Sequence, residues 1–349
     1  MAESATRQAV PRDRPLFGAY PWAVDRLPWT PLATLPTPVE RLDAPTPPDG
    51  AAGVEVWIKR DDLTASPYGG NKVRKLEFLL AQARAYGATR LITAGAYGSH
   101  HALATAIYGR ELGFDVTLVL FPQRRTEHVK AVMRAQEAAG AEIRFTSRME
   151  MVPVATLMAQ AAHRGDRTAV IPPGGSNPTG TLAYVNAALE LGHQVAAGEM
   201  PEPESIHVAA GTMGTMAGIA IGLEMTGLSS LVAGWRITSR IVTNEWAYRR
   251  LVVRTLRRLA RAGIDVPNAQ PILNRSLFFH DQIGAGYGRP TEAGDRATAA
   301  FARRGIALDA TYTAKAAAGM LEVVAGRHPE ATASGPVLFW HTLGGRLPE

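Results

Sequence analysis

The chain alternates between short apolar runs and longer segments in which apolar residues recur every three or four positions. The short runs predict β-strands, because they are a few residues long and rich in Val, Ile and Leu. The longer segments predict amphipathic helices with one buried face. The predicted strands lie at residues 54–58, 90–93, 116–121, 142–145, 169–171, 206–209, 231–237 and 337–340. The predicted helices lie at residues 73–86, 101–112, 127–139, 151–163, 181–191, 215–226, 244–261, 292–303 and 314–326.

Strands and helices follow one another along almost the whole chain. Strands separated by helices of this length indicate parallel pairing, because each helix returns the chain to the same end of a sheet. We therefore predict an α/β fold of the doubly wound type with two mostly parallel sheets. Residues 1–50 are rich in proline and predict an irregular arm. In this fold class ligands bind beyond the carboxyl ends of the strands, so the turns after the strands are the places to look for chemistry.

The composition excludes several classes of protein. Of the 349 residues, 46% are hydrophobic and 19% are charged, which is typical of a globular protein. The net charge of +6 is modest, and no nucleic-acid-binding motif accompanies it, so we expect no nucleic-acid partner. The absence of cysteine excludes disulfides and thiolate catalysis. No run approaches the roughly 18–20 apolar residues of a membrane span, and residues 1–15 lack a signal-peptide pattern, so we expect a cytoplasmic protein without a membrane partner.

One lysine stands out by its position. Only five of the 37 basic residues are lysine, and Lys72 follows Gly69-Gly70-Asn71 at the start of a predicted helix. The N-terminus of a helix carries partial positive charge, which disfavours an ammonium group and lowers the pKa of the amine. A neutral amine is the form that attacks an aldehyde to make a Schiff base. Lys72 is therefore a candidate catalytic lysine, although the position taken alone also suits an ordinary surface lysine.

Three glycine-containing turns connect predicted strands to predicted helices. They are Gly95 to His101, Gly174 to Asn177, and Gly211 to Thr215. A turn of this kind exposes backbone N–H groups at a helix N-terminus, where an anion binds. In the first turn, Ser99 also suits a simple helix cap. The third turn lacks the pattern of a nucleotide-binding P-loop, so a small phosphate monoester fits it better than a nucleoside triphosphate.

An activated lysine together with an anion site predicts a phosphorylated aldehyde, pyridoxal 5′-phosphate (PLP), as the cofactor. Two tyrosines in polar or glycine-flanked loops, Tyr287 and Tyr312, are further candidates, although a buried tyrosine is commonly a hydrogen-bonded core residue. The adjacent His100 and His101 indicate a metal only weakly, because neighbours on a helix point about 100° apart and no carboxylate lies at ligand spacing. We therefore expect no metal.

The chain resembles the D-cysteine desulfhydrase / 1-aminocyclopropane-1-carboxylate (ACC) deaminase family, in the fold type II (tryptophan synthase β-like) group of PLP enzymes. The resemblance extends over about residues 32–345. Its motifs are Ile58 to Thr64, Gly69 to Glu77, Gly174 to Asn177, Gly284 to Gly288, Leu308 to Lys315, and His341-Thr342. The resemblance implies a larger cofactor-binding domain made of residues 1–75 and 169–349, a smaller domain at residues 76–168, and an active site between them.

The resemblance also implies roles for individual residues. Lys72 would form the Schiff base with PLP and remove the α-proton of the substrate. Ser99 would contact the substrate carboxylate, and Tyr287 and Tyr312 match the two active-site tyrosines of the family. Lys75 would hold the phosphate together with the loop made of Gly211, Thr212, Met213, Gly214 and Thr215.

Three further positions bear on the reaction that the resemblance implies. Thr313 stands where the deaminases carry glutamate near the pyridine nitrogen, and this leaves Thr342 to contact that nitrogen, as in the desulfhydrases. A neutral hydroxyl there leaves the ring nitrogen largely unprotonated, which suits elimination of a good leaving group. His100 replaces the asparagine that contacts the phenolic oxygen of PLP, so the pocket departs from the family pattern at this point.

We therefore expect a PLP-dependent lyase or deaminase that eliminates a β-substituent from a small amino acid such as D-cysteine, giving a 2-oxo acid and ammonia. Racemisation or β-replacement is the alternative within the enzyme class, because these reactions share the same carbanion. A PLP-binding homologue without catalysis is the alternative of another class, because His100 breaks the pattern. We expect the protein to be a homodimer.

Overall fold

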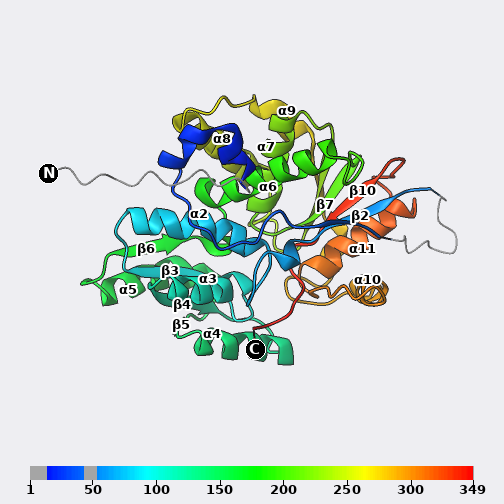
Figure 1. Cartoon of the computed structure of the whole chain (residues 1–349). Helices are drawn as coiled ribbons and strands as arrows, with labels where there is room; N and C mark the ends of the chain where they lie inside the picture. Colours follow the sequence, from blue (N-terminus) through cyan, green and yellow to red (C-terminus); the bar gives the residue numbers. More distant parts are fainter. Residues whose placement is uncertain (1–13, 43–52, 349) are drawn as a thin grey trace.

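The computed structural model describes residues 14–42 and 53–348, which form two β-sheets with helices on both faces (Figure 1). The larger sheet has six strands in the order β1-β2-β10-β7-β8-β9. Its strands are β1 (Val39–Leu42), β2 (Val56–Lys59), β7 (Ser205–Ala210), β8 (Leu231–Arg236), β9 (Ser276–Phe279) and β10 (Val337–Trp340). The smaller sheet has four strands in the order β5-β4-β3-β6. Its strands are β3 (Arg90–Ala96), β4 (Asp115–Phe121), β5 (Glu142–Phe145) and β6 (Thr168–Ile171).

Almost all of the strand pairing is parallel. Each pair of neighbouring strands runs parallel except β1 and β2, which are antiparallel. The predicted fold class, an α/β protein with mostly parallel sheets, is confirmed. Parallel strands place their carboxyl ends at one edge of a sheet, so the turns after β3, β6, β7 and β10 are available to build a common site.

Helices cover both faces of the six-stranded sheet. On one face lie α6 (Pro178–Ala196) and α7 (Gly214–Thr226), with α8 (Glu245–Arg261) and α9 (Ala269–Asn274) packed against them. On the other face lies α11 (Thr313–Val324), which packs on α10 (Glu292–Ala302). Strand β8 shows the alternation that this arrangement requires, because Val232 belongs to the first core and Ala233 to the second.

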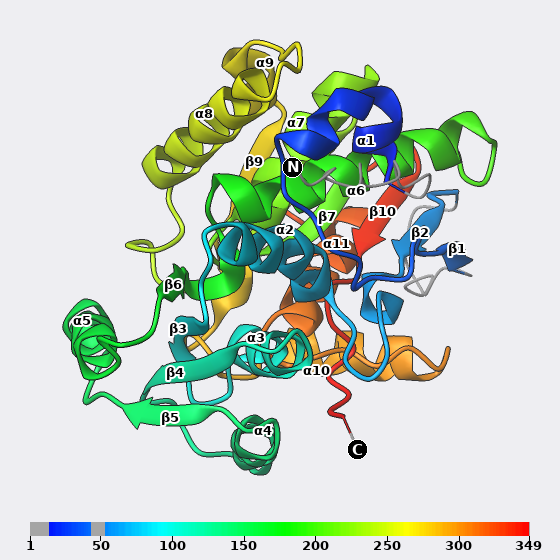
Figure 2. The ribbon, with the colours of Figure 1, turned by 60° about the vertical axis from the view of Figure 1, so that its left-hand side comes forward.

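Helix α2 (Asn71–Ala85) lies between the two sheets. It contacts α6 beside the larger sheet and α3 (His100–Glu111) beside the smaller one. Helix α4 (Glu127–Ala138) packs next to α3, whereas α5 (Val152–Ala162) covers the opposite face of the four-stranded sheet (Figure 2). The start of α2, where Lys72 lies, is therefore set by packing on both sides.

Every predicted strand and helix is present. Strands β5 and β10 have the predicted limits, and most other elements differ by one to three residues. Helix α6 differs most, because it begins at Pro178 rather than at residue 181 and extends to Ala196. The side chain of Asn177 caps it by accepting a hydrogen bond from Gly180 N at 2.8 Å. Pro178 suits the first helical position, where the N–H has no helical partner.

The prediction of an irregular arm at residues 1–50 holds for residues 26–38, which form no helix or strand, but is wrong for the rest of the described part of that segment. A short helix, α1, spans Pro15–Ala19, and β1 pairs with β2 at the edge of the larger sheet. Strand β1 has four residues, of which only Leu42 is buried, so its sequence shows no alternating pattern. Strand β9 and helix α9 were also not predicted. Residues 1–13 and 43–50 of the predicted arm lie outside the described residues.

The predicted division into residues 1–75 with 169–349 and residues 76–168 stays a prediction. Strand β6 bears on its position, because β6 pairs with β3 from Arg90–Thr168 to Thr93–Ile171. A boundary between residues 168 and 169 therefore falls within a strand of the four-stranded sheet.

No helix in the described part of the chain combines the length and the apolar character that crossing a membrane requires.

A buried group of charged residues joins α2 to the larger sheet and to α6. Arg74 of α2 donates from Nη2 to Asp61 Oδ1 at 2.8 Å and from Nη1 to Glu190 Oε2 at 2.9 Å. Lys59, at the end of β2, donates to Glu190 Oε1 at 2.5 Å. These four side chains are almost inaccessible to solvent, so each charge depends on its partners in this group. We call the four residues the Arg74 network.

Neutral donors complete the coordination of Asp61 within the Arg74 network. Tyr184 of α6 donates from its hydroxyl to Asp61 Oδ2 at 2.6 Å, and Trp340 of β10 donates from Nε1 to the same atom at 2.8 Å. The network therefore contacts β2, β10, α2 and α6 at once. Burial alone would raise the pKa of Glu190, but the charges of Arg74 and Lys59 outweigh burial and lower this pKa to about 2.

We expect Glu190→Gln to destabilise the protein by about 3–5 kcal/mol, because it leaves two buried cations without their shared carboxylate. Urea unfolding at neutral pH measures this loss. The pKa of Glu190 lies below its ordinary value of 4.5, so its contribution is complete above that pH and is lost as the pH falls toward about 2. The variant should therefore show a smaller loss of stability over that acid range than the wild type. The exposed Glu127→Gln is the control and should leave the unfolding midpoint unchanged.

Candidate active site

Lys72 lies in the first turn of α2, where the ends of β10 and α7 meet. Asn71 donates from its backbone N to Thr342 O at 2.9 Å and from Nδ2 to Thr215 Oγ1 at 3.1 Å. Lys72 Nζ donates to Asn71 Oδ1 at 2.7 Å. Gly70 has a φ of 114°, and a Cβ at this residue would lie 3.0 Å from Thr342 O. Glycine is therefore required for this turn to approach the end of β10.

The electrostatics of Lys72 agree with a reactive amine. Burial lowers the pKa of Lys72 to about 8, although the nearby Asp309 carboxylate acts in the opposite direction. Asp309 is itself only 4% exposed, and burial raises the pKa of its carboxyl group. A substantial fraction of the amine is therefore neutral near physiological pH, which nucleophilic attack on an aldehyde requires.

A candidate anion site lies one helical turn from Lys72. Lys75 Nζ donates to Gly174 O at 3.1 Å and to Ser176 Oγ at 3.3 Å. Ser176 Oγ also contacts Thr212 Oγ1 at 2.7 Å and accepts from Gly214 N at 3.3 Å. Burial, followed by the charge of Lys72, lowers the pKa of Lys75 well below its ordinary value. The Lys75 amine, two hydroxyls and the N-terminus of α7 surround one position, and such groups are the donors that bind a phosphate group.

Two features of the backbone keep the anion site open. A Cβ on Gly214 would lie 2.5 Å from Ser176 Oγ and 3.1 Å from Lys75 Nζ. Met213, which precedes α7, has a φ of 62° and is the only non-glycine residue with a positive φ in the described part of the chain. The left-handed conformation costs a side-chain-bearing residue about 1–2 kcal/mol, so this loop is held in a strained shape at the point where the helix N–H groups are exposed.

Ser99 lies at the N-terminus of α3. Its Oγ accepts from Ala102 N at 3.2 Å, so the helix-cap interpretation is confirmed. A Cβ on Gly95 would lie 2.4 Å from Ser99 Oγ, which explains the glycine at the end of β3. The hydroxyl proton of Ser99 is not used in the cap and remains available to a ligand.

The two predicted tyrosines meet, although 25 residues separate them. Tyr287 and Tyr312 have their hydroxyl oxygens 2.5 Å apart and their rings in an edge-to-face arrangement. Lys315 donates from Nζ to Ile283 O at 2.7 Å and to Gly286 O at 3.0 Å, so it fixes the loop that carries Tyr287. Burial raises the pKa of Tyr287 to about 12 and the pKa of Tyr312 well above its ordinary range, so both hydroxyls stay protonated at neutral pH.

Of the two threonines that sequence reasoning placed near the pyridine ring, Thr313 is engaged with the backbone. Its Oγ1 accepts from Asp309 N at 2.7 Å and donates toward Leu343 O at 3.2 Å. Thr342 is also buried, but its carbonyl rather than its hydroxyl joins the turn at Asn71. Thr342 Oγ1 is therefore the better placed of the two hydroxyls to receive a ligand.

His100 is buried and both of its ring nitrogens face protein groups. Nδ1 forms a short hydrogen bond with the hydroxyl of Tyr68, and Nε2 lies 3.1 Å from His128 Nε2. Burial, with further contributions from His128 and Lys72, lowers the pKa of His100 to about 3, so the imidazole is neutral. The predicted contact between His100 and PLP stays a prediction, and it requires His100 to give up one of these protein contacts.

Sequence reasoning missed four residues that the structure places at the site. Asn71 contacts Lys72, and Ser176 contacts Lys75. His128 and Asp309 both lie close to His100. The glycine turn at 174–177 and the motif at 308–315 pointed to Ser176 and Asp309 without giving them roles. No local signal pointed to His128, because its partner lies 28 residues away on another helix.

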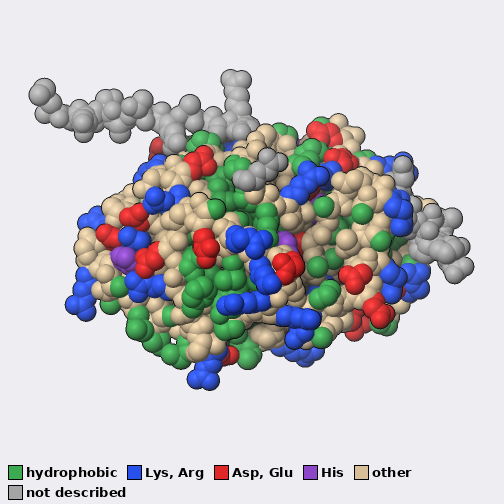
Figure 3. Space-filling model, turned by 90° about the horizontal axis from the view of Figure 1, so that it is seen from below, with side chains coloured by type: hydrophobic (Ala, Val, Ile, Leu, Met, Phe, Trp, Pro, Cys, Tyr) green, Lys and Arg blue, Asp and Glu red, His purple; other side chains and the backbone are tan. Residues whose placement is uncertain are grey.

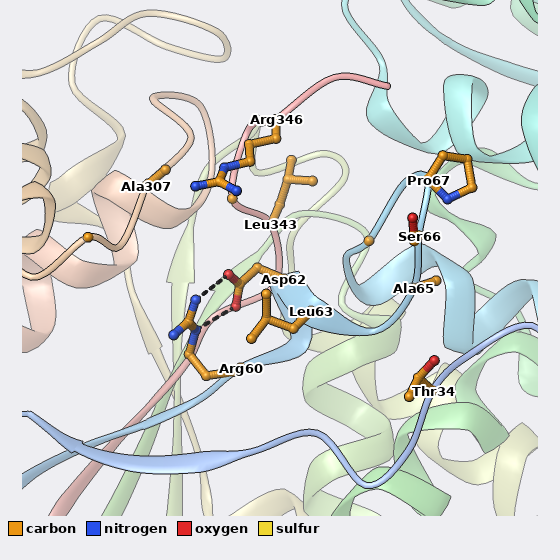
Figure 4. Close-up of a pocket in the computed structure, with 13 residues that line it drawn as sticks. Thr34, Arg60, Asp62, Leu63, Ala65, Ser66, Pro67, Ala307, Leu343 and Arg346 are labelled. Atoms are coloured by element: carbon orange, nitrogen blue, oxygen red, sulfur yellow. Dashed lines mark hydrogen bonds and ion pairs between the residues drawn. The ribbon is translucent and has the colours of Figure 1, made fainter. Parts of the chain in front are cut away.

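A separate cavity of about 400 Å³ lies near the C-terminal segment (Figure 4). Arg60 and Asp62 form a two-point ion pair on its wall, with both N–O distances at 2.9 Å. Leu343 and Arg346 line it from the end of the chain. None of the predicted site residues lines this cavity, so it is distinct from the site around Lys72.

Comparison with known proteins identifies the family of the chain. The model of the pyridoxal-phosphate dependent enzyme family matches residues 31–342. The chain belongs to this family. The predicted cofactor, PLP, and the prediction that the protein is an enzyme are thereby confirmed.

Individual relatives of this PLP-dependent enzyme agree with the predicted resemblance. A D-cysteine desulfhydrase of Klebsiella pneumoniae (strain 342) is 35% identical over 343 residues, which cover 91% of this chain and 94% of the relative. A nocardicin C-9′ epimerase of Nocardia uniformis subsp. tsuyamanensis is 36% identical, with 90% of this chain and 92% of the relative covered. Among solved structures, an ACC deaminase homologue matches with a TM-score of 0.76 and 31% identity, and 95% of each chain is covered. The predicted family resemblance is confirmed.

The residues of the site fit both the aldehyde and the phosphate group of PLP. The aldehyde requires an amine with a lowered pKa, which Lys72 supplies. The phosphate requires an anion site at a short distance along the helix, which Lys75, Ser176 and the N-terminus of α7 supply. The close fit of Gly214 against Ser176 leaves no room for a side chain in this site.

We expect covalent attachment of PLP to the PLP-free protein to become faster as the pH rises, with a midpoint near pH 8, because the pKa of Lys72 is lowered to about 8. In Asp309→Asn this pH profile should move to lower pH, because the carboxylate that raises the pKa of Lys72 is removed. Stopped-flow absorbance after mixing with PLP measures both profiles. Asp265→Asn, an exposed carboxylate between α8 and α9, is the control and should leave the profile in place.

We expect Gly214→Ala to weaken PLP binding by more than about tenfold, because the added methyl group contacts Ser176 Oγ and Lys75 Nζ. Fluorescence titration of the PLP-free protein gives the dissociation constant. Gly165→Ala is the matched control, since a Cβ there meets no atom within 4 Å. Equal PLP affinity in Gly214→Ala and wild type would contradict the assigned anion site.

Proposed function

We propose that this PLP-dependent enzyme is a lyase that removes the β-substituent of a small amino acid such as D-cysteine. The observation that carries the proposal is Lys72, an amine with a pKa lowered to about 8 beside an anion site. The 35% identity to a D-cysteine desulfhydrase over 91% of the chain supports the substrate class. With D-cysteine and water as reactants, the products are pyruvate, ammonia and hydrogen sulfide.

The proposed roles follow from the contacts at the site. Lys72 attaches the cofactor and moves the α-proton. Lys75 and Ser176, together with the loop at residues 211–215, hold the phosphate, and Thr342 contacts the ring nitrogen. A neutral threonine hydroxyl at this nitrogen supports elimination of a good leaving group, because it leaves the ring nitrogen largely unprotonated.

The chemistry of the proposed reaction requires a base near the α-carbon and a place for the substrate carboxylate. When bound, PLP supplies an electron sink for the negative charge that develops at the α-carbon. Lys72 Nζ accepts the α-proton, and burial keeps its pKa in the range where a general base is effective. The N–H groups at the start of α3, with the free O–H of Ser99, bind the substrate carboxylate.

The tyrosine pair can supply a proton to the substituent that leaves from the β-carbon. In the contact between Tyr287 and Tyr312 one hydroxyl donates and the other accepts, so one O–H remains free. Both phenols stay protonated at neutral pH because burial raises their pKa values. The free O–H can donate to the sulfur that leaves from the β-carbon.

We expect the wild-type protein to be yellow and to release 2-oxo acid and sulfide from D-cysteine. Lys72→Ala should lower kcat/KM by at least about 10²–10⁴-fold, the range for loss of a general base. Coupled detection of pyruvate and colorimetric detection of sulfide give the rates. Lys130→Ala, which changes an exposed lysine on α4, is the control and should keep full activity.

The same assay separates the alternatives. A colourless protein would contradict PLP binding. A yellow protein that yields no 2-oxo acid from D-cysteine or from a panel of D- and L-amino acids would contradict elimination. Exchange of the α-hydrogen with solvent deuterium, without 2-oxo acid, would instead indicate racemisation.

Racemisation or epimerisation is the second candidate. It is favoured by the epimerase that is 36% identical over 328 residues. Such a reaction requires proton transfer on both faces of the α-carbon, and Lys72 and the Tyr287–Tyr312 pair are two separate proton-carrying groups. Replacement of the β-substituent begins with the same removal of the α-proton as elimination. The two reactions are distinguished by adding an external thiol, which only replacement incorporates into the product.

A PLP-binding homologue without catalysis is the remaining alternative, and a yellow protein without any activity would support it.

We also propose that the protein is a cytoplasmic homodimer. The apolar side chains that α5 exposes, with Leu157 at 65% and Met158 at 64%, support association with a second copy, because exposed apolar surface of this kind is typical of an interface.

A further inference from the structure

Three side chains that can ligate a metal meet at the boundary between the two sheets. His100 Nε2 lies 3.1 Å from His128 Nε2 and 3.9 Å from Asp309 Oδ2. The three ligand atoms all lie within 4.8 Å of one another. They come from α3, from α4 and from the segment before α11, so the cluster exists only in the folded protein.

We propose that His100, His128 and Asp309 form a binding site for a divalent transition-metal ion of the Zn²⁺ class. Imidazole nitrogen and carboxylate oxygen are the ligands that such ions prefer. Two nitrogen ligands at about 2.0–2.1 Å from a tetrahedral Zn²⁺ lie about 3.3 Å apart, close to the 3.1 Å between the two histidine nitrogens. The exposed side chain of His128 can adjust to admit the ion. This proposal departs from the expectation of no metal drawn from the sequence, where the carboxylate is more than 200 positions from His100.

Contacts around the cluster already orient two of its three ligands. The hydroxyl of Tyr68 binds His100 Nδ1 and leaves Nε2 directed at the cluster. The backbone N of Tyr312 donates to Asp309 Oδ1 at 2.6 Å, so Oδ2 is the atom that faces His100. In known metal sites the second nitrogen of a ligating histidine is held by a hydrogen bond in this way.

The cluster is accessible from solvent on one side. His128 is exposed on α4, whereas His100 and Asp309 are buried. Figure 3, which views the molecule from below Figure 1, shows histidine side chains at the surface among basic and acidic side chains. An ion can therefore enter past His128, and water can complete its coordination as a fourth ligand.

The cluster lies between parts of the chain that belong to the two sheets. Binding would connect α3 and α4, which belong to the smaller sheet, to the segment that carries Asp309 and Tyr312 beside the larger sheet. It would also draw the charge of Asp309, which acts on Lys72, toward the ion. The inference rests on the ligand geometry and does not depend on the reaction proposed above.

We expect the PLP-loaded wild-type protein, freed of excess PLP by desalting, to bind one equivalent of Zn²⁺. Equilibrium dialysis with metal analysis measures the stoichiometry, and Co²⁺ added in place of Zn²⁺ should give the visible absorption of a tetrahedral site. His128→Gln should weaken binding by more than about tenfold, because it removes a direct ligand. His128 is exposed, so this variant should keep the fold and the PLP content.

His193→Gln is the matched control, because His193 is an exposed histidine on α6 outside the cluster, and it should bind Zn²⁺ as the wild type does. Zn²⁺ should raise the Tm of the wild type and of His193→Gln, but not that of His128→Gln, because a ligand stabilises only the state that binds it. Equal Zn²⁺ affinity in the wild type and in His128→Gln would overturn the proposal, since bound PLP or another surface group would then be the ligand.

Discussion

The buried charges of the Arg74 network are the constraint on which the position of Lys72 depends. Arg74 lies two residues after Lys72 on α2 and is held by Asp61 and Glu190. A buried cation without its partners is strongly unfavourable, so this side of α2 has one position relative to β2, β10 and α6. With the helix fixed there, Lys72 and Lys75 face the turns at the carboxyl ends of the strands. The pairing of buried charges in the network thus fixes the position of α2 and, with it, the positions of Lys72 and Lys75.

Asp309 has a similar part on the other side of the site. Its carboxylate orients the turn that begins α11 through Tyr312 N, influences the pKa of Lys72, and lies 3.9 Å from His100 Nε2. One buried carboxylate therefore connects the amine, the tyrosine pair and the histidine cluster. Burial raises the pKa of Asp309, whereas the hydrogen bond from Tyr312 N lowers it. The charge of Asp309 therefore depends in part on the turn that begins α11.

Much of the fold could be predicted from the sequence because its signals are local. Helices such as α4 show an apolar stripe, and the buried strands of parallel sheets are short apolar runs. Strand β1 could not be found in this way, since only Leu42 of its four residues is buried and its stability comes from pairing with β2. The start of α6 at Pro178 followed from capping chemistry that the apolar pattern alone does not reveal.

The sequence by itself determined the parallel α/β class, the lysine beside a glycine turn and the glycine turns between strands and helices, because each depends on residues that are neighbours in the chain. Only the tertiary structure decided which distant groups act on them. It placed Ser176 against Lys75, Tyr287 against Tyr312, and Asp309 near Lys72, since such contacts depend on how strands and helices pack rather than on spacing. For the same reason His100, which in the sequence only broke a family pattern, became in the structure part of a cluster with His128 and Asp309.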